Sequence, residues 1–280
     1  MMSLTWKLLT ATALLSSTLM SATNTEVEDF LKESLGKNPN IKSLNIKVLE
    51  KREMPSPKGW DAFILSLDAV VKQGKSERPV SQNMIYFAKD DIITAELIDM
   101  STGEHLKNTI TPAFKAEFYD KKHLISGSAT SKHKVVIFSD PQCPYCTKFV
   151  PESVNYMKKY PETFAVYYYH FPLVSMHPAA LQITKAAIAA ELKGEKDITL
   201  KMYKTKIGTR EKDEQKIVDA FNKAAGTKIT VKDIHTKEVK AHSKHDLEVA
   251  RTMMVSGTPT MFFDGKKDGS KKKYREVKVK

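Results

Sequence analysis

Apolar residues in the first third of the chain alternate mostly with polar ones, as in strands that are half-buried in a sheet. This alternation follows a short helical pattern and runs through segments 41–48, 62–71, 84–88 and 92–98. Turn-forming residues separate the segments at 55–59, 73–75 and 89–91. We predict a small domain over 25–100, with a helix at 27–35 and an antiparallel sheet. Domains of this size have little margin of stability as solitary monomers, so we expect this domain to mediate dimerisation. The alternative is that it serves only as a spacer.

A different pattern governs the domain that we predict over 132–280. The continuous apolar run 134–139 is typical of a strand buried on both faces of a parallel sheet. A mostly apolar stripe predicts a helix after this run, because Phe149, Ser153 and Met157 recur every four positions with Val150 and Val154 beside them. Segment 164–171 predicts the next strand. A mostly helical insertion follows at about 176–255, with helices expected at 178–192, 196–207, 211–225 and 231–254, the last capped by Thr230. Two strands, 261–264 and 274–279, end the predicted domain.

Segment 101–131 separates the two predicted domains and has a mixed composition. It contains Thr111-Pro112, a stretch at 113–122 that is compatible with a helix, and Ser126-Gly127-Ser128. We interpret this segment as a linker.

The chain starts with an apolar run of about 13 residues after Lys7, ending at the small residues Ser21-Ala22-Thr23. Such a run is too short to span a bilayer of roughly 30 Å as a helix. Residues 1–22 therefore predict a signal peptide on a soluble, exported, periplasmic protein. A short buried helix of a cytosolic domain is the alternative.

Composition and charge narrow the class of protein only moderately. Of 280 residues, 41% are hydrophobic and 28% charged, which fits a globular fold and excludes collagen-like or low-complexity chains. The net charge is +12, and half of this excess lies in residues 266–280. We interpret the basic end as a solvated edge strand and expect no nucleic-acid partner.

The two cysteines, Cys143 and Cys146, carry the strongest chemical signal. A disulfide that closes so short a loop stabilises a fold by only roughly 2 kcal/mol, so a structural staple explains the pair poorly. Zinc needs about four ligands, and a lone CxxC provides half of them. Haem attachment requires histidine where this chain has Thr147. A redox pair is the favoured interpretation.

The predicted position of the pair, between a strand and a helix, supports redox chemistry. Unpaired N–H groups and the dipole at a helix N-terminus favour a thiolate. We expect Cys143 to be exposed and to attack a substrate disulfide, and Cys146 to be more buried and to resolve the mixed disulfide. Pro144 and Tyr145 lie between the two sulfur atoms and are expected to tune the redox poise.

Residues 139–149, with the sequence SDPQCPYCTKF, resemble the active-site segment of the periplasmic thiol:disulfide interchange proteins of the DsbC/DsbG family. A distant segment, Val255-Ser256-Gly257-Thr258-Pro259-Thr260, is similar to the cis-proline loop of that family. The resemblance implies that Pro259 is cis and that Thr258 presents its backbone to an extended substrate. Pro151 also matches a proline found within the active-site helix of many thioredoxins.

The resemblance implies an α+β fold in which an N-terminal cystatin-like dimerisation domain and a linker helix precede a C-terminal thioredoxin-fold domain with a helical insertion. It implies a homodimer that isomerises or reduces disulfides in unfolded or misoxidised exported proteins, without a cofactor or metal. A DsbD-like membrane thiol reductase or a DsbB-like oxidase would be the redox partner. This chain departs from the usual fold because its end leaves no room for the terminal helix.

Other functions and sites stay open as alternatives. The same fold could belong to a dithiol oxidase in the role of DsbA, or to a dimeric chaperone with secondary redox activity. His242 and His245 share one face of a predicted helix, but neighbouring lysines favour a solvated face over a metal site. His170 and His177 follow a strand near the cysteines, and we interpret them as packed or surface histidines.

Overall fold

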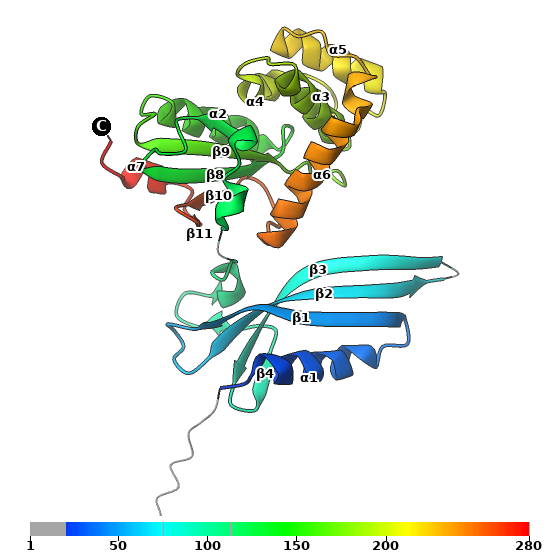
Figure 1. Cartoon of the computed structure of the whole chain (residues 1–280), viewed down its shortest axis with the longest axis vertical. Coiled ribbons are helices and arrows are strands. Elements are labelled where there is room, and N and C mark those ends of the chain that lie inside the picture. The colour runs from blue at the N-terminus through cyan, green and yellow to red at the C-terminus, as the bar shows by residue number, and fades with distance from the viewer. Residues whose placement is uncertain (1–20, 75, 113, 280) are drawn as a thin grey trace, which may run out of the picture.

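The computed structural model describes residues 21–74, 76–112 and 114–279. The predicted signal peptide lies outside these residues except for its last two positions. The described chain has two parts, an N-terminal sheet with one long helix and a C-terminal sheet surrounded by helices (Figure 1).

The N-terminal part begins with helix α1 (Asn24–Gly36). Thr23 and Glu26 cap this helix reciprocally, because each side chain accepts a hydrogen bond from the backbone N–H of the other residue. Four antiparallel strands follow in spatial order β1-β2-β3-β4. Their bounds are Ile41–Glu53, Asp61–Gln73, Ser76–Lys89 and Ile92–Thr94. The predicted helix and alternating segments are present, although the fourth strand ends at Thr94 and not at Ile98.

Strand β2 packs apolar side chains on both faces of this sheet. Phe63 and Leu65 point to the face covered by α1, where they join Val27 and Leu31 of the helix. Ala62, Ile64 and their neighbours form a second cluster on the opposite face. The short pair β5 (Ile98–Asp99) and β6 (Glu104–His105) and the turn η1 (Leu106–Asn108) follow.

The C-terminal sheet has the strand order β11-β10-β8-β9-β7. Its strands span Leu124–Ser126 (β7), His133–Ser139 (β8), Phe164–His170 (β9), Thr260–Phe263 (β10) and Lys266–Lys267 (β11). Only β8 and β9 are parallel, and helix α2 (Pro144–Met157) connects them. The strand-helix-strand unit predicted around the cysteines is therefore confirmed.

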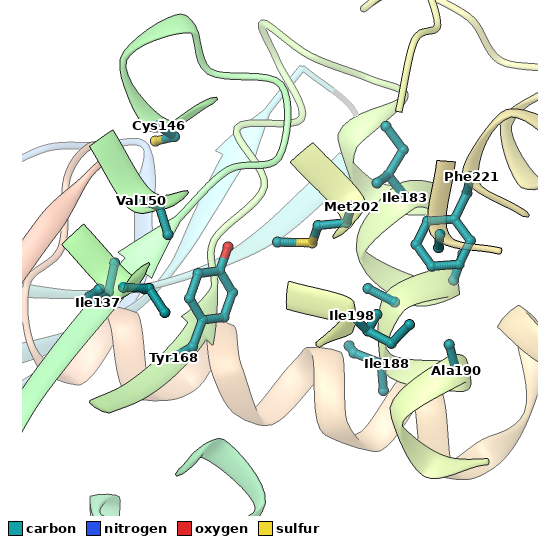
Figure 2. Close-up of a cluster of buried hydrophobic side chains, with 14 of the residues drawn as sticks. Ile137, Cys146, Val150, Tyr168, Ile183, Ile188, Ala190, Ile198, Met202 and Phe221 are labelled. Atoms are coloured by element: carbon teal, nitrogen blue, oxygen red, sulfur yellow. The ribbon is translucent and has the colours of Figure 1, made fainter. Parts of the chain in front are cut away.

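Both faces of this sheet are buried, which explains the continuous apolar runs in its central strands. Val135 and Ile137 of β8 face a core shared with α2 and the helical insertion, whereas Val136 and Phe138 face a second core under α6. Tyr168 of β9 and Met202 of the insertion lie in the first core, with Met202 directed toward the Tyr168 ring (Figure 2).

The insertion between β9 and β10 is helical, as predicted. It contains α3 (Ala180–Leu192), α4 (Ile198–Lys201), η4 (Met202–Lys204), α5 (Glu214–Ala225), η5 (Asp233–His235) and α6 (Lys237–Thr252). The last helix begins later than expected, because Thr236 and not Thr230 caps it. The C-terminal end of α6 reaches the N-terminal sheet, where the Asn83 side chain donates to the Thr252 carbonyl (Figure 1).

The expected linker helix is wrong for the described residues of segment 101–131. The only helical elements among its described residues are three-residue turns, including η2 (Ala116–Phe118) and η3 (Lys121–His123). They lie between the two-residue strand β6 and strand β7. Phe114 and Phe118 bury their rings against the second core, and the Phe114 N–H donates to the Gly265 carbonyl. These contacts hold the backbone along the sheet. Because β7 pairs with β9, the C-terminal sheet also starts before the predicted boundary at 132.

The predicted strand at 274–279 is also wrong, since the short helix α7 (Lys273–Glu276) lies there. Among its described residues, the basic end forms an edge strand only at Lys266–Lys267, where β11 lies at the edge of the sheet. The buried Asp268 carboxylate accepts the Lys273 N–H and the Ser270 hydroxyl, which turns the chain. Tyr274 then packs edge-on against Tyr156 of α2, with ring centroids 5.5 Å apart.

Gly127, directly after β7, offers a sharp test of this sheet arrangement. Its φ is +76°, and a Cβ atom there would lie 1.9 Å from the Phe164 carbonyl oxygen. We expect Gly127→Ala to lower the free energy of unfolding by about 3 kcal/mol, measured by denaturant titration. Gly194 is the matched control, because its φ is +85° but nothing lies within 4 Å. Equal effects of the two substitutions would contradict the close packing of β7 on β9.

Candidate active site

Cys143 occupies the N-cap position of α2, where the chain leaves strand β8. Pro144 stands at the first helical position, which suits proline because the missing N–H would have no helical partner. Pro151 lies inside the same helix, as the sequence predicted. The pair thus sits at a helix N-terminus, where backbone N–H groups favour negative charge.

The Cys143 sulfur lies against the predicted cis-proline loop. Its Sγ is 3.6 Å from the carbonyl oxygen of Thr258, and the Thr258–Pro259 peptide bond is cis. The expectation that Cys143 is exposed is wrong, since only 5% of the residue is accessible. Contact with the Thr258 loop covers it, and this long-range packing could not be inferred from the local motif.

Cys146 is fully buried one turn into the helix. Burial raises the pKa of its thiol to about 11, and the charge of Cys143 acts in the same direction. The hydroxyls of Ser139 and Thr258 and the Asp140 backbone act against this rise. Cys146 is therefore held as a thiol at neutral pH. Both cysteines are free in this structure.

Asp140 organises the turn that leads to Cys143. Its buried carboxylate accepts the backbone N–H groups of Gln142 (2.6 Å) and Cys143 (3.0 Å) through Oδ1. Through Oδ2 it accepts the Leu173 N–H at 2.6 Å and lies 3.1 Å from His177 Nδ1. One side chain thus ties the active-site turn to the segment after β9. The sequence analysis missed Asp140, although its position within the motif was a usable signal.

A hydroxyl network lies on the core side of the same turn. The Tyr203 hydroxyl donates to Ser139 Oγ at 2.7 Å and is 2.7 Å from the Tyr168 hydroxyl. Burial raises the pKa of both tyrosines well above the ordinary value, so both are neutral donors. Nothing in the sequence pattern pointed to Tyr203, because the insertion brings it to β8 from 64 residues away.

A groove of about 460 Å³ opens beside the cysteine pair. Its lining contains the two residues predicted to tune the redox poise and the two predicted to bind substrate. Three further residues of α2 and one lysine near the C-terminus complete it. The residues are Pro144, Tyr145, Lys148, Phe149, Glu152, Thr258, Pro259 and Lys271. Tyr145 is 78% exposed, so its ring is available for contact. Four of the six sequence-predicted site residues line this groove, and Cys143 contacts one of them, Thr258, from its buried position.

The high pKa of Cys146 leads to a spectroscopic prediction. In reduced Cys143→Ser protein, thiolate absorbance should appear only well above the ordinary thiol pKa of about 8.5. The signal is the difference from a variant lacking both cysteines, which removes the tyrosine contribution. Complete ionisation of Cys146 below about pH 9 would contradict the burial effect. Because the folded-state pKa is raised, the contribution of this thiol to stability should be lost as the pH rises toward 11.

Of the four histidines considered in the sequence analysis, His242 departs from the expectation of a solvated face. His242 is half-buried and not on a solvated face, and its Nε2 lies 3.6 Å from Asp246. His170 is buried, as a packed histidine would be, and burial lowers its pKa to about 4. His177 joins the Asp140 turn, and His245 stays exposed.

A family model described as thioredoxin matches residues 120–279. Two curated relatives are Na⁺/H⁺ antiporters NhaA 1, from Mycolicibacterium gilvum (26% identity over 149 residues) and Mycolicibacterium vanbaalenii (25% over 150 residues). The matches cover 51% and 52% of this chain but only 23% and 24% of those proteins. The chain therefore spans about a quarter of their length. In the described residues, no helix combines the length and apolarity needed to cross a membrane.

Two solved structures are similar to the chain at low identity. ScsC of Proteus mirabilis, in a transitional conformation, has 22% identity and a TM-score of 0.44, and the match covers 54% of this chain and 68% of ScsC. Oxidised BdbD of Bacillus subtilis has 15% identity and a TM-score of 0.47, with 60% and 93% covered. The match of the family model to more than half of the chain identifies the family. This chain belongs to the thioredoxin family and has a mixed α/β thioredoxin-like fold.

Proposed function

We propose that this protein is an exported thiol:disulfide oxidoreductase that isomerises or reduces disulfides in folding proteins of the periplasm. The observation that carries the proposal is the position of Cys143, at the start of α2, against the cis Thr258–Pro259 bond and beside an apolar groove. The resemblance of this site to the DsbC/DsbG family supports the finer assignment.

In the proposed reaction, the Cys143 thiolate attacks one sulfur of a substrate disulfide. A mixed disulfide forms, and the other substrate sulfur leaves as a thiolate that takes up a proton. In reduction, Cys146 then loses its proton and attacks Cys143, which releases the second substrate thiolate and leaves a Cys143–Cys146 disulfide. In isomerisation, a substrate thiolate attacks the mixed disulfide instead, and Cys143 is returned reduced.

Burial, the main cause of the raised pKa of Cys146, slows its attack on the mixed disulfide, and isomerisation requires this delay. Because only the thiolate attacks, a protonated Cys146 prolongs the life of the mixed disulfide. A substrate thiol then has time to rearrange the bond. An oxidase needs the opposite resting state, with the disulfide closed and recharged by a DsbB-like partner; the isomerase would be kept reduced by a DsbD-like membrane reductase.

The groove is the proposed site for an unfolded segment next to its disulfide. Tyr145, Phe149 and Pro259 offer apolar contact, which suits side chains that are exposed only before folding. We propose that the Thr258 backbone pairs with the extended substrate, as the family resemblance implies. Pro144 and Tyr145 are proposed to set the redox poise through the turn between the sulfurs.

We propose that the N-terminal sheet and α1 form a domain that mediates homodimerisation. A linker and the catalytic domain follow this domain along the chain. Exposed apolar side chains on this part, among them Phe30, Leu49 and Ile92, support an interaction role. Sedimentation equilibrium of the purified protein should give twice the mass of the chain. A monomer at all concentrations would remove dimerisation from the proposal without affecting the exchange chemistry.

Two assays separate the proposed activity from its alternatives. Reduced protein should restore activity to ribonuclease with scrambled disulfides, whereas oxidised protein should reactivate reduced ribonuclease less efficiently. The opposite ranking would identify a dithiol oxidase. Suppression of aggregation that persists in the Cys143→Ser variant, with no activity in either assay, would identify a chaperone and overturn the proposal.

A further inference from the structure

A cluster of histidine and carboxylate side chains lies outside the proposed redox site, between η3 and α6. The Asp246 Oδ1 atom is 2.7 Å from His123 Nε2 and 3.6 Å from His242 Nε2. One potential ligand atom from each of these residues lies within 4.8 Å of the others. His242 and Asp246 are one helical turn apart, so both project from the same face of α6.

The surrounding contacts hold two of these ligands in place. The other carboxylate oxygen of Asp246 accepts the His170 backbone N–H at 3.0 Å, which leaves Oδ1 directed at the histidines. The His123 ring stacks on Tyr169, with centroids 4.0 Å apart and planes 12° apart. The carboxylate is therefore held by a backbone hydrogen bond, as ligating carboxylates are in metal centres, and the His123 ring is held by stacking.

Burial makes the cluster distinct from an ordinary surface group. The side chains of His123 and Asp246 are 2% and 0% exposed, and that of His242 is 13% exposed. His123, His170 and His242 line a cavity of about 360 Å³. Buried Nδ1 atoms of His123 and His170 have no hydrogen-bond partner among the described residues. The cavity thus gives access to the rings of His123 and His242, the two histidines of the cluster.

We propose that His123, His242 and Asp246 bind a divalent transition-metal ion, of which Zn²⁺ is the best match. Two imidazoles and one carboxylate form a common zinc ligand set, with a fourth position left for water from the cavity. Zinc bonds of about 2.0–2.1 Å place tetrahedral ligand atoms roughly 3.3 Å apart, between the two distances given above. The ion would replace the proton between His123 and Asp246. Ca²⁺ and Mg²⁺ prefer oxygen ligands and fit less well.

The proposed ion would join parts of the chain that are distant in sequence. His123 directly precedes the edge strand β7, whereas His242 and Asp246 belong to the insertion. Metal binding would therefore stabilise the docking of α6 on the sheet. This role does not depend on the redox function proposed above.

The test uses untagged protein with Cys143→Ser and Cys146→Ser, because the cysteine pair would itself bind zinc. Calorimetric titration with Zn²⁺ alone should show one equivalent bound, and Co²⁺ should give the visible spectrum of a tetrahedral site. The melting temperature should rise with Zn²⁺ concentration but not with Ca²⁺.

His242→Ala should weaken Zn²⁺ binding by at least about tenfold. His235→Ala is the matched control, because His235 ends η5, two residues before α6 begins at Lys237, and pairs instead with Glu214 at 2.7 Å. Circular dichroism without metal checks that both variants are folded. The proposal is overturned if no stoichiometric binding occurs, if His242→Ala binds like the parent, or if both variants lose binding equally. A cluster stabilised by hydrogen bonds alone would give the first of these results.

Discussion

Replacing Cys143 with serine is expected to lower the rate of thiol–disulfide exchange by at least about 100-fold. Serine preserves the shape of the site, but its hydroxyl has no accessible anion at neutral pH to attack a disulfide. The measurement is the rate of insulin reduction with excess dithiol. Because Cys143 contributes little to the buried core beyond its sulfur, the free energy of unfolding of the reduced protein should change by less than about 1 kcal/mol.

Cys146→Ser provides the complementary control for the Cys143 prediction. This variant retains the attacking thiol but cannot resolve the mixed disulfide, so substrate should stay attached to Cys143 and be visible on non-reducing gels. Substrate trapped in the Cys143→Ser variant instead would reverse the two roles. Equal activity of Cys143→Ser and the parent protein would remove the cysteine pair from the mechanism.

Replacing Asp140 with alanine should lower the free energy of unfolding by about 3–5 kcal/mol. The substitution leaves the N–H groups of Gln142 and Leu173 without their acceptor and removes the partner of His177. The Cys143 N–H keeps only its longer bond, of 3.4 Å, to the backbone carbonyl of residue 140. It also releases the turn that positions Cys143. Denaturant unfolding of the reduced protein measures the first effect, and the redox equilibrium with glutathione measures the second.

Two further substitutions separate the parts of the Asp140 effect. Asp140→Asn keeps one carbonyl acceptor and should cost less than Asp140→Ala. His177→Gln tests the link to the segment after β9 and should leave the Cys143 N–H bond in place. If Asp140→Ala unfolds at the same denaturant concentration as the parent, the carboxylate does not hold this turn.

The parts of the fold that local sequence determines were predicted well. The central strands, helix α2 and most helices of the insertion carry their signal in neighbouring residues, such as the apolar run 134–139. The predictions of a helix at 113–122 and of a strand at 274–279 were wrong, because long-range contacts determine the structure of these segments. Phe114 bonds to Gly265 and Tyr274 packs on Tyr156, and neither contact leaves a periodic pattern.

The candidate site shows the same division between local and long-range information. The CPYC motif is visible in a short segment, and the cis peptide bond at Pro259 was implied by the family resemblance of a second one. The burial of Cys143 and the approach of Tyr203 depend on how distant segments pack. The cluster around Asp246 was missed because His123 lies 123 residues away along the chain.

The central claim is that Cys143 and Cys146 act as a reversible dithiol–disulfide couple. Its most direct test is the equilibrium of the purified protein with mixtures of reduced and oxidised glutathione, resolved by acid quenching and mass spectrometry. We predict one two-electron transition between the dithiol and a Cys143–Cys146 disulfide, without a dominant glutathione adduct. Cysteines that stay reduced in every mixture, or that accumulate only glutathione adducts, would contradict the claim.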